Sequence, residues 1–470
     1  MNTYLIFLLA FSVALILFGA ALGKLVRGSS DFFVAGRKLG PGLLFSTVLA
    51  ANIGAGSTVG VAGLGYRDGL SAWWWVGSAA VGTLCLALWI GPKIWKIAAS
   101  RGYYTVGDFL EGRYGSEVRV VIAALLWVGT LAILAGQLIA LAWVLNVVAG
   151  VPKYAGCLIG GVVMVTYFTA GGLIGSAWVN SVQLTVLLFG FAVAIPIAVN
   201  GVGGFGPLAF ASQSVGESFT NFFSGGSSGW RYLPLLAPAF IISPGLLQKV
   251  YGARDRRSIV VGVGATAAFM LVFAFVPTIL GMIARINHPD LAHPELALPT
   301  IFMLDMPFFV GVVGLAALFA ADVSSADAIL FMFSTSFAQD LYRRYLRPDA
   351  SDAAVLRVAR WSALGGGAIA VVLAIAASSV IDALRIFYSL LSVSLFVPVL
   401  MGLYTRRAGK VEALSAIVGG TLFTAGIHQA THGVGIAGMT PTMIGLAVSF
   451  MVASVLLFVR RQPAQREVGE

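Results

Sequence analysis

Apolar residues run through the chain in blocks of about 20, separated by short polar segments. A block of this length spans the hydrocarbon core of a bilayer when it forms an α-helix. Thirteen blocks predict one membrane helix each, and the fold class is therefore an all-α integral membrane protein. The blocks are 4–23, 42–65, 71–95, 118–148, 153–171, 178–200, 230–249, 259–284, 306–341, 354–377, 380–403, 411–427 and 438–459.

The distribution of basic residues predicts the orientation of these helices. With the N-terminus outside, 24 of the 29 Lys and Arg residues fall in inside segments. Cytoplasmic loops carry such an excess of positive charge. We therefore predict a multi-pass protein of the cell membrane (plasma or inner membrane), with an outside N-terminus and a cytoplasmic C-terminus. Topology also explains the net charge of +10, so no nucleic-acid partner is expected.

Composition excludes a soluble enzyme. Only 10% of the residues are charged, whereas soluble domains carry roughly 25%. The two cysteines lie in apolar runs and the four histidines show no metal-ligand spacing, so neither a disulfide framework nor a transition-metal site is expected. The partners we expect are the lipid bilayer and small molecules, and no catalytic residue is expected.

The block that includes 47–66 is a poor straight helix. It contains five glycines, and Asn52, Ser57 and Thr58 place polar groups at mid-membrane depth. Irregular backbone at that depth is tolerated only inside protein or along a watery cavity. The pattern therefore predicts a broken helix at a binding site. Close helix packing through small residues is the alternative.

A second break is predicted in 230–249, where Pro234, Pro238 and Pro244 interrupt an apolar run beside Ser243. Each internal proline removes a helix hydrogen bond. If the first helix is an extra element, the broken helices are the first and sixth of a ten-helix core. This spacing is typical of two inverted five-helix repeats; two unrelated kinks are the alternative.

We expect one membrane transporter domain, 1–470. Its parts are an N-terminal helix and inside loop (1–40), a first repeat (41–200), a second repeat (229–405), and two C-terminal helices with a tail (406–470).

The block 306–341 contains two adjacent hydroxyls on an apolar helix. Ala321, Ser324 and Ser325 lie at i, i+3 and i+4, so they share one face. The hydroxyls either bond to carbonyls of their own helix or bind a hard cation such as Na⁺, which prefers oxygen ligands. Carbonyls freed by the break near Ala50 and Ile53 would complete a sodium site.

Several motifs together resemble the sodium/solute symporter family, which has the leucine-transporter-type inverted-repeat fold. They are DFFVAGRKLG (31–40), AANIGA (50–55), TVGDFLEGRYG (105–115), GGL (171–173) with Gln183, LLQKVYGARD (246–255), ADVSSAD (321–327) and QDLYRR (339–344). The resemblance implies Na⁺ bound by backbone oxygens of Ala50, Ile53 and Ala321 and by the hydroxyls of Ser324 and Ser325.

The predicted substrate site combines the two breaks with two further helices, 118–148 and 380–403. The resemblance implies that residues of the first break and Arg385 face the substrate. Gln137, midway along the apolar block 118–148, is a further candidate, although its amide could instead bond between helices. The expected substrate-binding residues are Asn52, Gly54, Ser57, Gln137, Phe240, Ser243 and Arg385.

Two departures from relatives refine this expectation. Val179 and Asn180 replace a Thr-Asp pair, which favours one sodium per cycle. Gly56 and Ser57 replace the acid and amide side chains of sugar-transporting relatives, which disfavours a sugar. Because Arg385 can hold a carboxylate with its planar fork, a monocarboxylate or an amino acid is expected.

The function predicted is a sodium-coupled symporter that imports a small, carboxylate-bearing solute by alternating access. Arg385 could instead pair with Asp382, which would favour a neutral solute such as a nucleobase or an amide. Asp322, beside the serines, could carry a proton. The alternative is therefore a proton-coupled or sodium-independent carrier or exchanger; a channel or a sensor domain of the same fold are more distant possibilities.

Overall fold

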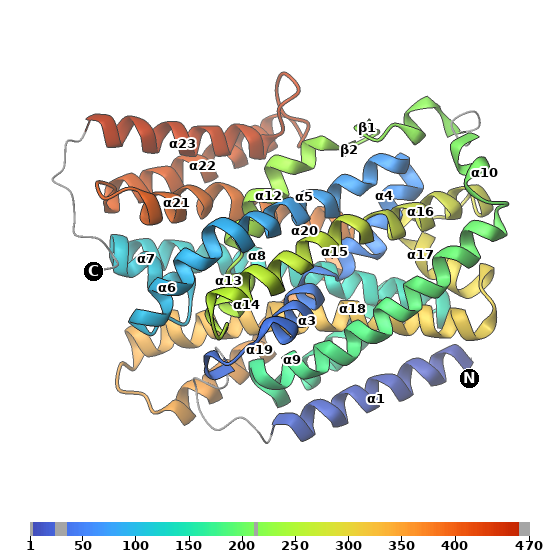
Figure 1. Ribbon diagram of the computed structural model, residues 1–470, viewed down its shortest axis with the longest axis horizontal. Coiled ribbons are helices and arrows are strands. Elements are labelled where there is room, and N and C mark those ends of the chain that lie inside the picture. Colours follow the sequence, from blue (N-terminus) through green and yellow to red (C-terminus); the bar gives the residue numbers. More distant parts are fainter. Residues whose placement is uncertain (1–2, 24–34, 211–214, 460–470) are drawn as a thin grey trace.

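The computed structural model describes residues 3–23, 35–210 and 215–459, without the side chains of 12, 15, 16, 18–23, 35 and 167–180. The described chain is a bundle of helices that run roughly parallel or antiparallel (Figure 1). The longer helices lie side by side, with α1 along one edge of the bundle and α22 and α23 along the opposite edge. Their bounds follow.

The α-helices of the N-terminal half are α1 (Thr3–Gly23), α3 (Pro41–Asn52), α4 (Val59–Asp68), α5 (Trp73–Cys85), α6 (Gly91–Arg101), α7 (Val106–Tyr114), α8 (Ser116–Ala149), α9 (Lys153–Gly201) and α10 (Phe205–Phe210). Those of the C-terminal half are α12 (Leu233–Ile242), α13 (Pro244–Tyr251), α14 (Arg256–Ser258), α15 (Gly264–Phe273), α16 (Phe275–Asn287), α17 (Ala297–Thr300), α18 (Phe308–Thr335), α19 (Asp352–Ala376), α20 (Val380–Ser394), α21 (Phe396–Tyr404), α22 (Lys410–Ala430) and α23 (Pro441–Val459).

Short helical turns connect these helices. They are η1 (Ala35–Arg37), η2 (Ala55–Ser57), η3 (Gly69–Ala72), η4 (Leu86–Ile90), η5 (Glu217–Thr220), η6 (Trp230–Tyr232), η7 (Ile259–Val263), η8 (Pro294–Leu296), η9 (Ile301–Asp305) and η10 (Ser336–Leu346). One small hairpin departs from the all-α expectation: β1 (Ser224–Gly225) pairs antiparallel with β2 (Ser228–Gly229).

The helices confirm an all-helical membrane protein. Ten helices of the described residues are long and apolar enough to cross a bilayer. The count of thirteen stays a prediction. One helix, α9, contains two of the expected blocks, and the side chains of 167–180, where these blocks adjoin, are not described.

The first predicted break is confirmed. Helix α3 ends at Asn52, and Ile53 and Gly54 adopt extended backbone before the turn η2. The Ser57 hydroxyl fills the gap in the helix ladder, because it accepts a hydrogen bond from the Gly54 N–H (2.9 Å) and lies 3.0 Å from the Asn52 carbonyl oxygen. A side chain thus satisfies backbone groups that the break would leave without partners.

The second predicted break is also confirmed. Helix α12 ends at Ile242, and α13 begins at Pro244. The residue between them, Ser243, has non-helical backbone angles (φ −51°, ψ 121°). Pro244 is the first residue of α13, a position where its missing N–H costs no helix hydrogen bond.

Charged residues hold the segment after α6 against the end of α18. The guanidinium of Arg119, at the start of α8, contacts Asp108 (2.9 Å), Glu111 (2.5 Å) and Asp340. Arg119 and Asp340 are both buried. Because each partner neutralises the other in a place with little water, this cluster fixes α7, α8 and η10 together at one end of the bundle.

Glu295 belongs to the turn η8, between α16 and α18, and its side chain joins this turn to two helices by hydrogen bonds. Its carboxylate accepts hydrogen bonds from Trp143 Nε1 of α8 (2.9 Å) and from the backbone N–H of Val380 at the start of α20 (2.6 Å). The side chain is only 7% exposed. Burial raises the pKa of Glu295 to about 7, against the lowering effect of these hydrogen bonds.

We expect stability to fall as pH rises from about 4.5 to about 7, because the folded protein holds the Glu295 proton more tightly than the unfolded chain. The contribution is up to about 3 kcal/mol. In Glu295→Gln this dependence should be weaker, as measured by melting temperature at pH 5 and pH 7.5. The exposed Glu217→Gln is the matched control. Identical pH slopes for the wild type and Glu295→Gln would contradict the assignment.

Candidate functional site

The two serines of α18 face the end of α3. Ser324 Oγ lies 3.2 Å and Ser325 Oγ 3.1 Å from the Ala50 carbonyl oxygen. Ser324 Oγ also lies 3.0 Å from the carbonyl oxygen of Ala321. All four residues are at most 2% exposed. Tertiary packing therefore brings together, in one dry place, four of the five residues predicted to bind sodium.

The break explains why these oxygens are available. The last carbonyls of a helix have no partner in the next turn, and α3 stops inside the protein at Asn52. Ile53, the fifth predicted ligand, lies in the break and is fully buried; no contact between its carbonyl and the serines is recorded among the described residues. The serine hydroxyls donate to the freed Ala50 carbonyl, and a bound cation can replace those hydrogen bonds.

The chemistry of the donors fits an alkali cation. Hydroxyl and carbonyl oxygens are neutral, hard ligands of the kind that hard cations prefer. Among the residues that the structure describes, no group of three or more His, Cys, Asp or Glu side chains could hold a metal. The site therefore suits Na⁺ and lacks the nitrogen, sulfur or carboxylate ligands of a transition-metal site.

Glycine is required at position 54. A Cβ there would lie 2.5 Å from the Cβ of Ser325 and 2.8 Å from Oε1 of Gln137. Neither neighbour can move far, because the Ser325 Cβ is fixed to its helix and Gln137 Oε1 accepts a hydrogen bond from the Ala55 N–H (2.9 Å). Gly54 thus allows the broken helix to approach α18 and α8 closely.

A cavity of about 700 Å³, including the space at its opening, adjoins the serines. Its wall includes Ser325 and six of the seven residues predicted to bind substrate. Those six are Asn52, Gly54, Ser57, Gln137, Phe240 and Ser243.

Some of the polar groups in the cavity wall stabilise the break. Ser57 and Gln137 Oε1 bond to its backbone, and Asn52 Nδ2 donates to Thr83 Oγ1 at 3.3 Å. Within the described residues, Gln137 Nε2 and Ser243 Oγ have no recorded hydrogen-bond partner and are not sealed from the cavity. These two groups can therefore bond to a solute.

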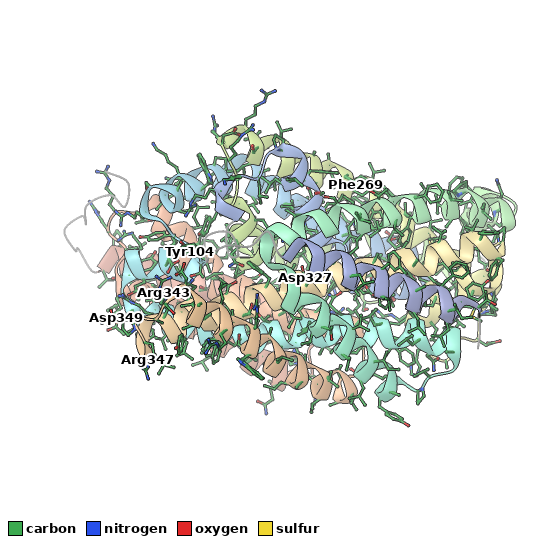
Figure 2. All side chains as sticks on the ribbon, turned by 90° about the horizontal axis from the view of Figure 1, so that it is seen from below. Tyr104, Phe269, Asp327, Arg343, Arg347 and Asp349 are labelled. Carbon is green, nitrogen blue, oxygen red and sulfur yellow. The ribbon has the colours of Figure 1, made fainter. Side chains whose placement is uncertain are left out.

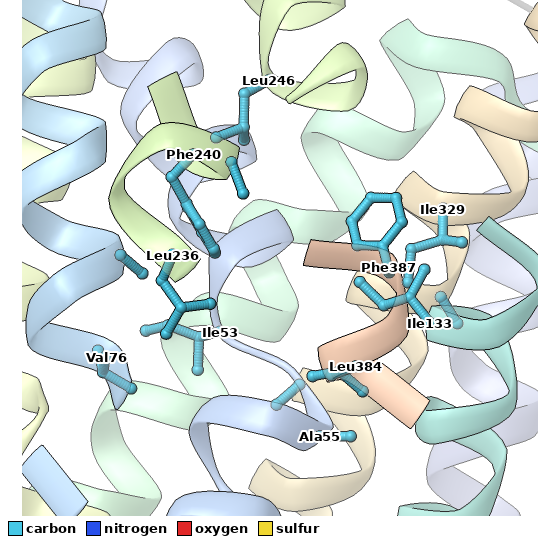
Figure 3. Packing of buried hydrophobic residues seen from close by; sticks show 14 of the residues in the cluster. Ile53, Ala55, Val76, Ile133, Leu236, Phe240, Leu246, Ile329, Leu384 and Phe387 are labelled. Atoms are coloured by element: carbon cyan, nitrogen blue, oxygen red, sulfur yellow. The ribbon is translucent and has the colours of Figure 1, made fainter. Parts of the chain in front are cut away.

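The rest of the wall is apolar. Figure 3 shows Phe240 and Leu246 on one side of the break and Ile133, Ile329 and Phe387 on the other. No described lining residue carries a charge at neutral pH. The arrangement can hold a compact solute with one polar end and an apolar body.

Arg385 is the residue that the structure does not bring to the cavity. Its guanidinium donates to the hydroxyl of Tyr232 (2.9 Å) and lies 3.8 Å from Asp382, with 38% of its side chain exposed. The Tyr232 ring in turn packs edge-on against Trp75, a cavity residue, at 4.9 Å. Arg385 does not line the cavity because it lies in the second turn of α20. From that position its side chain reaches the surface of the protein more easily than the centre.

Sequence reasoning identified Phe240 and missed the other aromatic residues of the wall. Trp75, Phe387 and Tyr388 line the cavity, and Tyr388 packs on Phe240 at 5.3 Å. The sequence pointed only weakly to these residues. Phe387 and Tyr388 are adjacent aromatic residues, but they belong to a helix that is rich in apolar residues throughout. Only the packing of the helices showed that these side chains line the cavity.

Two other sequence expectations have different outcomes. Asp322 is fully buried, and neither carboxyl oxygen has a hydrogen-bond partner among the described residues. Val179 and Asn180 belong to the segment whose side chains are not described, so the sodium stoichiometry that they suggest stays a prediction.

Two broken helices that border one solute-sized cavity, with buried hydroxyl and carbonyl oxygens beside it, are the architecture of a secondary transporter. Residues 32–420 match the Sodium:solute symporter family (SSF). The chain belongs to this family. It is therefore a sodium-coupled solute symporter and not an enzyme, and Na⁺ is its co-transported substrate.

Individual relatives carry different solutes. The chain is 27% identical to the sodium/pantothenate symporter of Escherichia coli. The alignment extends over 444 residues and covers 90% of each protein. It is 25% identical to the sodium/glucose cotransporter of Vibrio parahaemolyticus, over 83% of this chain and 78% of the other. The solved structure of a Na⁺-coupled sialic acid symporter, substrate-bound and outward-open, superimposes with a TM-score of 0.81 at 17% identity, covering 98% of both chains.

Proposed function

We propose that the protein imports one small, carboxylate-bearing solute, a monocarboxylate or an amino acid, together with Na⁺ by alternating access. One observation supports this proposal above all: Ser325 belongs both to the predicted sodium site and to the wall of the cavity. A cation held there lies beside the solute. Each ligand then favours the conformation that binds the other, which is the physical basis of coupling.

The cavity can bind a carboxylate without a charged side chain. Two helical N-termini reach it, since the turn η2, which leads into α4, and the first turn of α13 both line the cavity. An N-terminus carries partial positive charge, and half-helices in transporters use it to hold anionic groups. Gln137 Nε2 and Ser243 Oγ supply hydrogen bonds, and bound Na⁺ supplies a full charge. Arg385 is therefore not needed as a direct ligand.

The apolar wall then holds the body of the solute. Phe240, Phe387 and Tyr388 offer ring faces and edges, with few hydroxyl or amide partners among them. A polyhydroxylated sugar would leave several hydroxyls unpaired, at about 1–3 kcal/mol each. This mismatch supports a compact acid and disfavours a sugar.

A neutral solute, such as an amide or a nucleobase, is the second candidate. It is favoured by the uncharged cavity wall and by the 3.8 Å contact between Arg385 and Asp382, which leaves no free cation beside the solute. Proton coupling through Asp322 is the corresponding alternative for the driving ion.

We propose the orientation predicted from the basic residues: N-terminus outside and C-terminus in the cytoplasm. One Na⁺ moving inward gains about 2.3 kcal/mol per 100 mV of membrane potential, in addition to its concentration gradient. This energy permits uptake against a solute gradient.

Matched pairs of solutes test the proposal. Purified protein is melted with monocarboxylates and amino acids, and with the corresponding amides, in NaCl and in KCl at fixed pH. We expect the acid of a pair to stabilise more than its amide, and only in sodium, because Na⁺ and the carboxylate bind side by side. An amide that stabilises as well as its acid would favour the neutral solute, and equal shifts in both salts would refute sodium coupling.

Arg385→Gln is the control arm of the same assay. Because Arg385 reaches the cavity only through Tyr232 and Trp75, affinity for the acid should change by less than about threefold, or about 0.6 kcal/mol. A loss of tenfold or more would restore the sequence-based hypothesis that Arg385 binds the carboxylate directly.

A further inference from the structure

A second cavity lies next to the solute cavity. It has a volume of about 330 Å³, including the space at its opening, and its wall comes from α7, α8, α13, α18 and η10. Thr105 and Asp340 belong to this wall. Figure 2 shows their chain neighbours Tyr104 and Arg343 near one end of the bundle, and Asp327 closer to its middle. The second cavity therefore lies between the solute cavity and the end of the bundle that faces the cytoplasm in the orientation proposed above.

Met332 separates the two cavities. Its side chain lines both of them and is only 6% exposed. On the facing helix, Gly245 borders the first cavity and Pro244 borders the second. A Cβ at Gly245 would lie 3.7 Å from the Met332 sulfur, so this sulfur closes the gap beside a residue that has no side chain. Because methionine has three rotatable bonds, the partition can open by rotation of one side chain.

Gln248 is a buried amide in the wall of the second cavity. It is 3% exposed, and neither Oε1 nor Nε2 has a hydrogen-bond partner among the described residues. Two hydroxyls of the same wall are occupied, since Thr105 and Ser336 both donate to Asp340, at 2.8 and 2.7 Å. Burial of an unpaired amide is unfavourable. Its position in a cavity wall therefore indicates a partner that binds only during part of the transport cycle.

Helix α13 offers a polar group to each cavity. Ser243, its N-cap, lines the first cavity, and Gln248 lines the second. Five residues of α-helix span about 7.5 Å along the axis, so a solute that leaves Ser243 meets Gln248 little more than one turn further along. The amide donates through Nε2 and accepts through Oε1, and it can therefore bind a carboxylate or a neutral amide.

We propose that the second cavity is a transit site for the solute on its way to the cytoplasm, in which Gln248 binds the polar end of the solute after Met332 moves aside. This inference rests on the proposed function, because it concerns the path of the same solute. The amide of Gln248 is sealed from water in this conformation. The site therefore forms only when the second cavity widens.

Thiol labelling tests whether the second cavity opens to the cytoplasm. Thr130→Cys places a thiol in its wall, in a background that carries Cys85→Ser and Cys157→Ser. The probe is 2-carboxyethyl methanethiosulfonate, a small reagent with a carboxylate, added to inside-out membrane vesicles. Bound Na⁺ favours the conformation that holds the solute, so the reaction should be about fivefold or more faster in KCl than in NaCl.

Thr278→Cys is the matched control, because Thr278 is also a buried helix threonine and lines neither of the two cavities. If Thr130→Cys does not fold, Ser336→Cys places the thiol in the same wall. A folded reporter that reacts no faster than Thr278→Cys, or equally fast in both salts, would overturn the transit site. A wild type that NaCl does not stabilise against heat would instead refute the proposed function.

The second test concerns the amide. Adding Gln248→Leu to the reporter should slow the reaction of 2-carboxyethyl methanethiosulfonate about threefold or more, because the amide no longer binds its carboxylate. The reaction of methyl methanethiosulfonate, which has no charged group, should not change. Gln339→Leu is the control, since Gln339 is a buried amide that lines neither of the two cavities. An equal effect of Gln248→Leu on both reagents, including no effect, would overturn the binding role of Gln248.

Discussion

Sodium-stimulated uptake is expected to disappear in the double variant Ser324→Ala/Ser325→Ala. Both hydroxyls lie within 3.2 Å of the Ala50 carbonyl oxygen, so their removal takes two of the five predicted ligands from the ion. A hydrogen-bonding group facing a charge contributes about 1.5–3 kcal/mol. Two such losses weaken sodium binding by about 100-fold or more. The measurement is the sodium concentration for half-maximal uptake.

Folding should survive this change, because alanine is a good helix former and the hydroxyls leave only small gaps. Ser334→Ala is the matched control. Ser334 is a fully buried serine of the same helix, and its hydroxyl bonds to the Phe331 carbonyl of its own helix (3.2 Å). If the double variant bound sodium with wild-type affinity, the site assignment would be wrong.

Gly54→Ala is expected to abolish transport with a change of one methyl group. The new Cβ would lie 2.5 Å from the Ser325 Cβ and 2.8 Å from Gln137 Oε1, closer than atoms can approach. Relief requires the broken helix to move away from α18, at a cost of about 1–3 kcal/mol. This movement separates the Ala50 carbonyl from both serines. Sodium affinity and solute affinity should therefore fall together.

The comparison is Gly42→Ala, in helix α3, which precedes the break that contains Gly54. A Cβ at position 42 would meet nothing within 4 Å, so uptake and stability should be close to those of the wild type. Binding of Na⁺ and of the solute is measured separately on each purified variant. Full activity in Gly54→Ala would mean that the close approach of α3 to α18 is not required for transport.

The two helix breaks and the shared helix face of the serines could be predicted from the sequence, because both depend on residues close together in the chain. Proline and glycine act on the backbone within a few residues, so the breaks at Gly54 and Ser243 follow from the sequence nearby. Ser324 and Ser325 share a face because of helix periodicity alone. The pairing of one break with this face came from resemblance to a family and is consistent with the distances reported above.

Other features depend on where a side chain points after packing. Arg385 and Asp382 were weighed as partners from their spacing, yet the bond from Arg385 to Tyr232 joins residues 153 positions apart. No local pattern encodes such a contact. The same is true of the aromatic wall, where Tyr388 meets Phe240.

The sequence by itself determined a membrane protein built from apolar helices, the two positions where helices break, and the two hydroxyls that share one face of α18. Each of these follows from composition or from short-range backbone rules. Only the tertiary structure decided that Arg385 lies outside the cavity and that the buried Lys249 ammonium lies 3.3 Å from the Thr47 hydroxyl oxygen. Those outcomes depend on how helices distant in the chain cross, and the spacing of residues within one helix does not reveal which side chains meet at a crossing.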